Sequence, residues 1–138
     1  MEILNNSRLL KILFWFWLAL IFIVSSIPYL SVPGFKFELV FFRSDYILHW
    51  FQYSVLIGLF VVWRSKIKSE FNRRIGFSAL LLGIFLASID ETHQIFIPGR
   101  HFNPIDMVYN YLGVFTGLLI AFLWIRKQKR DSEKSISL

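Results

Sequence analysis

A chain of 138 residues can form one domain at most, and 56% of its residues are hydrophobic and 19% aromatic. A soluble domain of this size has too much surface for its volume to bury that many apolar side chains, so the composition indicates a membrane protein. The absence of cysteine excludes a disulfide framework and a thiolate nucleophile. The net charge of +6 comes from basic residues that flank apolar segments, which argues against a nucleic-acid partner.

Four apolar stretches have the length needed to cross roughly 30 Å of hydrocarbon. We expect membrane spans at about 9–29, 45–63, 75–97 and 105–125, followed by a basic tail at 126–138. Basic residues precede the first stretch, as in a signal peptide, but its length and aromatic content favour a span that is retained. The predicted fold is therefore all-α, a four-transmembrane-helix bundle that forms a single domain over 1–138.

The distribution of Lys and Arg predicts the orientation of these spans. Twelve of the 15 basic residues lie at the amino end, in the loop between the second and third spans, or in the tail. The exceptions are Lys36, Arg43 and Arg100. Because cytoplasmic loops carry the excess of Lys and Arg, we predict that both termini are cytoplasmic and that loops 30–44 and 98–104 face outward.

Polar side chains gather at the predicted outer ends of three spans. Ionisable groups inside a span are costly, so they are functional candidates by default. In chain order the polar residues are Asp45, His49, Gln52 and Tyr53 on the second span, Asp90, Glu91, His93 and Gln94 on the third, and Asp106 and Asn110 on the fourth. Residues one turn apart share a helix face, and antiparallel spans bring all three sets to one depth.

The inner halves of the spans carry almost no polar groups. A transporter usually has polar residues near the midplane that continue toward both sides, so a one-sided pocket is favoured over a pore. A purely structural interpretation is that the polar groups pair with one another and fix the helix register. The convergence of carboxylates, an imidazole, amides and a guanidinium exceeds what register requires and favours a functional pocket.

Two glycines on the fourth span predict a close helix contact. Gly113 and Gly117 are four residues apart and therefore lie on the same face of a helix. This small-residue spacing lets the backbones of two membrane helices approach each other. We expect the contact to be with the first or second span of the same chain rather than with a second copy.

The stretch SIDETHQIFIPGRHFNPIDMVYNYLGVFTG at 88–117, together with the upstream pattern Asp45-x-x-x-His49-x-x-x-Tyr53, resembles the VanZ-like family of small bacterial membrane proteins. The matching positions are Asp45, His49, Tyr53, Glu91, Gln94, Pro98, Gly99, Arg100, Asp106, Asn110, Gly113 and Gly117. The sequence departs from the family at Tyr46, where a Lys often follows the Asp, and at Asn103, where an Asp is frequent. The resemblance implies a bacterial cytoplasmic membrane protein linked to the cell envelope and to resistance to glycopeptides, chiefly teicoplanin.

Residue chemistry suggests roles for an enzyme. Candidate catalytic residues are His49, Glu91, Asp106 and Asp45, and candidate substrate-binding residues are Arg100, Gln94, Asn110 and Tyr53. A carboxyl group in a partly desolvated site can act as general acid or base. His49 can be the second proton-transfer group, oriented by the Asp45 carboxylate one turn away. The fork of the Arg100 guanidinium suits a phosphate or carboxylate. An outward-facing site at this depth can reach lipid headgroups, so we expect hydrolysis or group transfer on a membrane lipid or lipid-linked envelope precursor.

Two alternatives stay open at this point. The first is a non-catalytic pocket that binds a lipid-linked precursor, an antibiotic or an envelope protein. The second is a divalent metal site, for which Asp45, His49, Glu91, His93 and Asp106 offer ligand atoms. Glu91 and His93 are two apart and diverge by about 200° around a helix, so a metal is the weaker alternative and no residue is assigned as a ligand.

Overall fold

The structure, a computed structural model, describes residues 6–29, 35–37, 40–42, 44–68 and 71–136. Four long helices make up most of this part of the chain: α1 at Ser7–Ser25, α2 at Ser44–Lys68, α3 at Arg73–His93 and α4 at Pro104–Ile136. A short 3-10 turn, η2 at Gln94–Phe96, continues the end of α3. All four long helices have the length and hydropathy to cross a membrane, which confirms the predicted all-α, four-helix fold.

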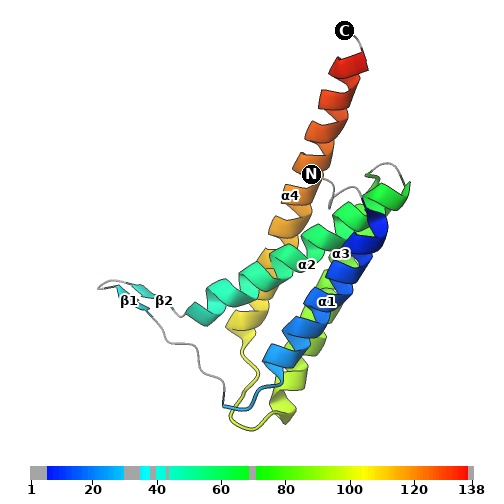
Figure 1. Cartoon of the computed structure of the whole chain (residues 1–138). Helices are drawn as coiled ribbons and strands as arrows, with labels where there is room; N and C mark the ends of the chain where they lie inside the picture. The colour runs from blue at the N-terminus through cyan, green and yellow to red at the C-terminus, as the bar shows by residue number, and fades with distance from the viewer. Residues whose placement is uncertain (1–5, 30–34, 38–39, 43, 69–70, 137–138) are drawn as a thin grey trace.

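The helices run alternately up and down (Figure 1). The start of α1, the α2–α3 connection and the end of α4 lie toward the upper end of the view. The end of α1, the start of α2, the end of α3 and the start of α4 lie toward the lower end. The three polar segments predicted from the sequence are therefore at the same end of the bundle.

Local capping residues explain where α1 and α3 begin. The Asn6 side chain accepts hydrogen bonds from the backbone N–H groups of Arg8 and Leu9, at 3.0 and 3.2 Å. Asn72 accepts one from Ile75 N at 3.0 Å. Such caps satisfy N–H groups that have no partner inside the helix. α1 ends at Ser25, ahead of the predicted boundary, because Pro28 restricts the residue before it and cannot continue a helix.

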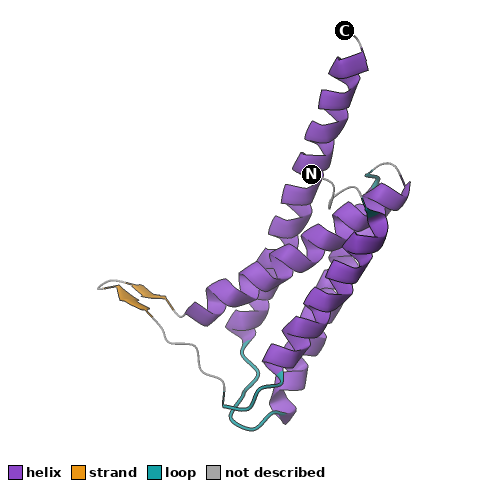
Figure 2. Cartoon of the chain, in the orientation of Figure 1, coloured by secondary structure: helices purple, strands orange, loops and turns teal. Residues whose placement is uncertain are grey.

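The basic tail is helical, so α4 extends well past the predicted span boundary at 125 and reaches Ile136. The sequence from 118 to 138 contains neither Gly nor Pro and is rich in Lys, Arg, Gln and Glu near its end. These residues have high helix propensity, so nothing stops the helix where the apolar stretch ends. Figure 2 shows this last part of α4 projecting beyond the other helices.

α2 and α4 form the most extensive helix contact in the bundle. A Cβ atom at Gly113 would collide with the backbone carbonyl of Trp50, and one at Gly117 with the carbonyl of Ser54. The two backbones can approach this closely only because both positions are glycine. The Trp50 indole N–H also donates to Thr116 Oγ1 across the pair, at 3.1 Å. The predicted glycine contact is therefore made with the second span.

The bundle has an apolar interior and an apolar exterior. Its interior core includes Phe14, Ile57, Val61, Ala87 and Val114, which come from all four helices. Large apolar side chains are also exposed along the helices, among them Phe16 at 63%, Phe85 at 61% and Leu119 at 56%. Exposing such a continuous apolar surface to water is unfavourable, so this exterior suits contact with lipid.

A small hairpin precedes α2 at the lower end of the bundle, within the predicted outer loop (Figure 2). Strand β1 at Phe35–Phe37 pairs antiparallel with strand β2 at Val40–Phe42, and Phe37 faces Val40 in the register. Among the described residues these are the strands of the only sheet. The hairpin lies beside the start of α2 and away from α1 and α3 in this view.

Candidate functional site

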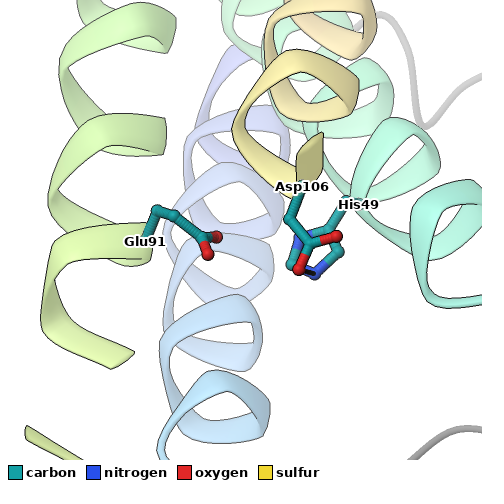
Figure 3. A group of neighbouring side chains, drawn as sticks. All are labelled: His49, Glu91 and Asp106. Carbon is teal, nitrogen blue, oxygen red and sulfur yellow. Dashed lines mark ion pairs between the residues drawn. The ribbon is translucent and has the colours of Figure 1, made fainter. Parts of the chain in front are cut away.

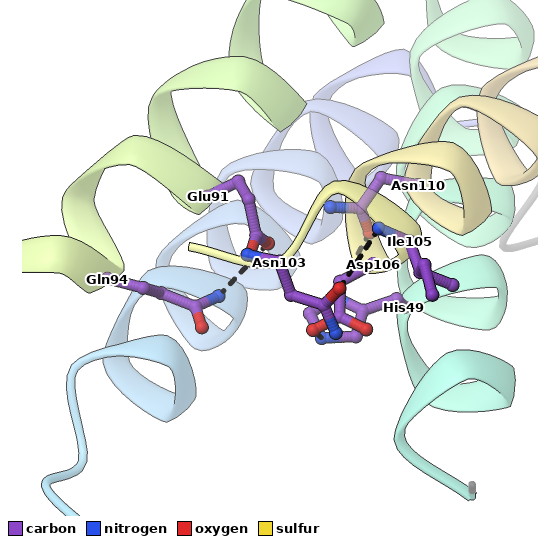
Figure 4. A network of polar contacts seen from close by, with 7 residues as sticks. All are labelled: His49, Glu91, Gln94, Asn103, Ile105, Asp106 and Asn110. Atoms are coloured by element: carbon purple, nitrogen blue, oxygen red, sulfur yellow. Dashed lines mark hydrogen bonds and ion pairs between the residues drawn. The ribbon is translucent and has the colours of Figure 1, made fainter. Parts of the chain in front are cut away.

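Five buried polar side chains meet where α2 begins, α3 ends and α4 begins (Figure 4). They are His49 from α2, Glu91 and Gln94 from the end of α3 and η2, and Asp106 and Asn110 from the start of α4. Each is at most 8% exposed, and Glu91 and Asn110 are fully buried. All five were predicted as site residues, and the structure brings them together.

His49 lies between two residues of α4. Its Nδ1 is 3.1 Å from Asn110 Oδ1, and its Nε2 is 3.8 Å from Asp106 Oδ2. Because an amide oxygen only accepts hydrogen bonds, Nδ1 carries the proton of this contact. In a neutral imidazole the Nε2 lone pair then points toward the Asp106 carboxylate. The glycine contact between α2 and α4 lies one turn further along and sets this separation.

Glu91 ties the α3–α4 connection to the site. Its Oε1 accepts a hydrogen bond from the backbone N–H of Asn103 at 2.8 Å, and Gln94 Nε2 lies 3.5 Å from its Oε2. The side chain of Asn103 in turn accepts from Ile105 N at 3.0 Å and caps α4, with Pro104 at the first helical position. Asn103 was predicted only as a departure from the family. The capping role of Asn103 could have been predicted from the sequence, because an Asn-Pro pair directly precedes an apolar run.

The imidazole of His49 and the carboxylates of Glu91 and Asp106 face one another (Figure 3). His49, Glu91 and Asp106 each offer one ligand atom, and these atoms all lie within 4.8 Å of one another. They come from three different helices, so the cluster forms only when the bundle folds. Among the residues that the structure describes, these three, and not Glu91 with His93, form a group that could hold a metal ion.

Arg100 and Asp45 lie beside the cluster on the wall of a cavity of about 40 Å³, which His49 also lines. A single buried water needs roughly 10–15 Å³, so this space admits water close to the imidazole. Asp45 was predicted to orient His49. The structure gives Nδ1 a contact with Asn110, and Asp45 shares the cavity wall with the imidazole.

The loop that carries Arg100 has a conformation that only glycine adopts without strain. Gly99 has φ +76°, and a Cβ there would collide with the ring of Tyr29. The backbone N–H of Tyr29 donates to Pro98 O at 3.1 Å, and Arg100 N donates to Ile97 O at 3.0 Å. The end of α1 and the α3–α4 connection are thereby held together next to the cavity.

A second polar group lies deeper in the same end of the bundle. Asp90, Ser25 and Tyr53 come from three helices, and Asp90 is only 1% exposed. The Ser25 and Tyr53 hydroxyls lie near the Asp90 carboxylate. Within the described part of the chain, none of Ser25 Oγ, Tyr53 Oη and Asp90 Oδ1 has a hydrogen bond at ordinary distance. Ser25 and Asp90 line the cavity, so water there can satisfy them.

Tyr53, predicted to bind substrate, belongs to this second group. Ser25 was not among the predicted site residues, although it is the polar residue at which the first apolar run ends. The other two histidines lie outside the cluster of His49, Glu91 and Asp106, although His93 acts electrostatically on Asp90 of the second polar group. His93 packs against Phe22, with ring centroids 6.3 Å apart, and His101 is exposed in the α3–α4 connection.

Comparison with known families gives one match. The family model described as VanZ/LLP1 matches residues 9–125 and so covers most of the chain, including the whole of α2 and α3, most of α1 and α4, and every residue of the site. No curated protein and no solved structure matches the chain.

Proposed function

The chain belongs to the VanZ/LLP1 family, and we propose that it acts at the outer face of the bacterial cytoplasmic membrane, where its buried polar site hydrolyses or transfers a group on a lipid or lipid-linked envelope precursor. The observation that carries the proposal is the meeting of His49, Glu91 and Asp106 from three helices, beside a cavity that admits water. The apolar exterior of the bundle suits contact with lipid, which places a lipid-borne substrate next to this end of the protein.

Each residue has a chemical role in such a reaction. In a hydrolysis, His49 accepts a proton from water, and the water oxygen forms a bond to the acyl or phosphoryl centre. The bond to the leaving oxygen breaks, and a carboxylic acid at Glu91 or Asp106 supplies the proton that this oxygen takes up. Arg100 binds the anionic part of the substrate, and Gln94 and Asn110 orient it. In a transfer reaction, an acceptor hydroxyl takes the place of water.

Polar variants of nearly unchanged shape test this proposal. We expect His49→Gln, Glu91→Gln and Asp106→Asn to be present in the membrane at the wild-type level and to lose protection against teicoplanin. His101→Gln is the matched control, since this exposed side chain lies outside the site, and it should keep protection. If the three site variants are abundant and still protect, the proposal is wrong. If protection only follows abundance, the polar residues serve folding.

The outward orientation has a separate test, because the chain contains no cysteine of its own. A cysteine introduced at Arg100 should react with a membrane-impermeant maleimide added to intact cells. A cysteine at Lys68, the last residue of α2 at the other end of the bundle, should react only after the membrane is opened. Labelling of the Lys68 position in intact cells would reverse the proposed orientation.

A second function is favoured by the contacts of Glu91. Because this carboxylate accepts a hydrogen bond from Asn103 N, it holds the α3–α4 connection in place, as a binding site without turnover would require. Such a protein would bind a lipid-linked precursor, an antibiotic or an envelope partner. His49→Gln separates the two functions: an enzyme variant still binds substrate and releases no product, whereas a binding protein keeps protection. Product release is followed by mass spectrometry of lipid extracts.

A further inference from the structure

When the imidazole is neutral, the contact between His49 and Asp106 joins two hydrogen-bond acceptors. Asn110 Oδ1 takes the proton of His49 Nδ1, which leaves the Nε2 lone pair facing Asp106 Oδ2 at 3.8 Å. This separation is too long for a hydrogen bond, although it is within the range of an ion pair if the imidazole is protonated. Two atoms bonded to one metal ion at about 2.1 Å each are separated by about 3.4 Å at a tetrahedral angle and by up to about 4.2 Å when they lie on opposite sides of the ion. The observed distance lies in that range.

Glu91 adds a third ligand atom on the open side of this pair (Figure 3). The three ligand atoms lie within 4.8 Å of one another, so a small side-chain rotation brings all of them to bonding distance of one point. Two buried carboxylates that face each other are unfavourable unless a cation or a proton compensates their charge. A divalent ion at this point compensates both.

The amide groups around the cluster hydrogen-bond to the candidate ligands, as groups that orient metal ligands do in known sites. A ligating histidine usually donates its second ring N–H to an oxygen, which fixes the tautomer, and His49 does so to Asn110. Glu91 is held by Asn103 N and lies near Gln94 Nε2. The amide nitrogen of Asn110 is fully buried and has no hydrogen-bond partner among the described residues. It can therefore donate to an oxygen bound on the ion.

We propose that His49, Glu91 and Asp106 form a site for one divalent first-row transition ion, with Zn²⁺ the best fit and Mn²⁺ the next. An imidazole nitrogen selects against Mg²⁺ and Ca²⁺, which take oxygen ligands. Three protein ligands leave a position open for water or a substrate oxygen, which is the arrangement of catalytic zinc sites. The ion would polarise that oxygen and so take over from His49 the activation of water.

Ion binding can be measured without substrate. The metal-site proposal is therefore tested independently of the proposed reaction. The full chain, purified in detergent without a histidine tag and stripped with a chelator, is titrated with Zn²⁺ in a calorimeter. Bound metal is then counted by mass spectrometry after dialysis. We expect one Zn²⁺ per chain, weaker binding of Mn²⁺, and no binding of Mg²⁺ at the same concentrations.

Variants then locate the ion. His49→Gln, Glu91→Gln and Asp106→Asn should each weaken Zn²⁺ binding at least tenfold, and Asn110→Ala by about 10- to 100-fold, as loss of an outer contact does. His93→Gln and His101→Gln should bind as wild type does. Size-exclusion profiles and circular dichroism show which variants are folded. One folded variant among the three ligand substitutions is enough for the test. Absence of Zn²⁺ binding by the wild-type protein overturns the inference, and so does undiminished binding by a folded ligand variant.

Discussion

The site end and the middle of the bundle use the same pair of helices in opposite ways. At the start of α2 and α4, buried His49, Asp106 and Asn110 interact through polar atoms. One or two turns further along, the same helices meet through Gly113 and Gly117, with backbone against backbone. The polar contacts are few and have specific geometry, whereas the glycine contact is steric, backbone against backbone, and tolerates no added atom. The glycine contact in the middle of the bundle therefore sets the separation of α2 and α4 at the site end.

The largest expected effect comes from the middle. Gly113→Ala places a Cβ against the carbonyl of Trp50, and we expect it to lower the free energy of unfolding by about 3 kcal/mol and to reduce the amount of protein in the membrane. The matched control is Gly58→Ala, whose Cβ would meet its nearest atom, Gly117 O, only at 4.0 Å. Thermal unfolding in detergent measures both. Equal loss in the two variants would show that close packing does not fix the pair.

The next effect separates structure from chemistry at the site end. Glu91→Ala leaves the backbone N–H of Asn103 without its acceptor, which should cost about 2 kcal/mol of unfolding free energy. Glu91→Gln keeps an acceptor oxygen and should cost clearly less, while it removes the charge. A Gln variant that is as unstable as the Ala variant would mean that the charge of Glu91, rather than its hydrogen bond, holds the connection.

A smaller effect concerns the start of α4. Asn103→Ala removes the cap on Ile105 N and should cost about 1 kcal/mol. Asn103→Asp keeps the accepting oxygen and restores the residue that is frequent in the family, so its unfolding temperature should stay close to that of the wild type. A large drop in the Asp variant would indicate that an added negative charge beside Glu91 is not tolerated.

The smallest effect is expected outside both regions. Lys129 and Glu133 form an exposed ion pair of 3.9 Å on the last part of α4. Exposed pairs of this spacing contribute little, so Glu133→Gln should change the unfolding free energy by no more than about 0.5 kcal/mol. A greater loss would mean that this part of α4 is packed against a partner in the membrane-bound protein.

The sequence alone was enough to predict the four spans, since hydropathy over about 20 residues is a local property. It was also enough to place His49, Glu91, Asp106 and Asn110 at one end, because alternating spans bring their ends together. The helical tail was missed, although the helix propensity of its residues was a local signal that pointed to it.

Only the tertiary structure decided which polar groups meet. Whether His49 or His93 joins the carboxylates depends on how each helix is rotated and how closely α2 approaches α4, and spacing along one helix contains neither quantity. The pairing of Glu91 with a backbone N–H was equally hidden, because any residue other than proline at that position offers the same group. Helix formation rests on local interactions, whereas the site depends on distances between helices that packing sets.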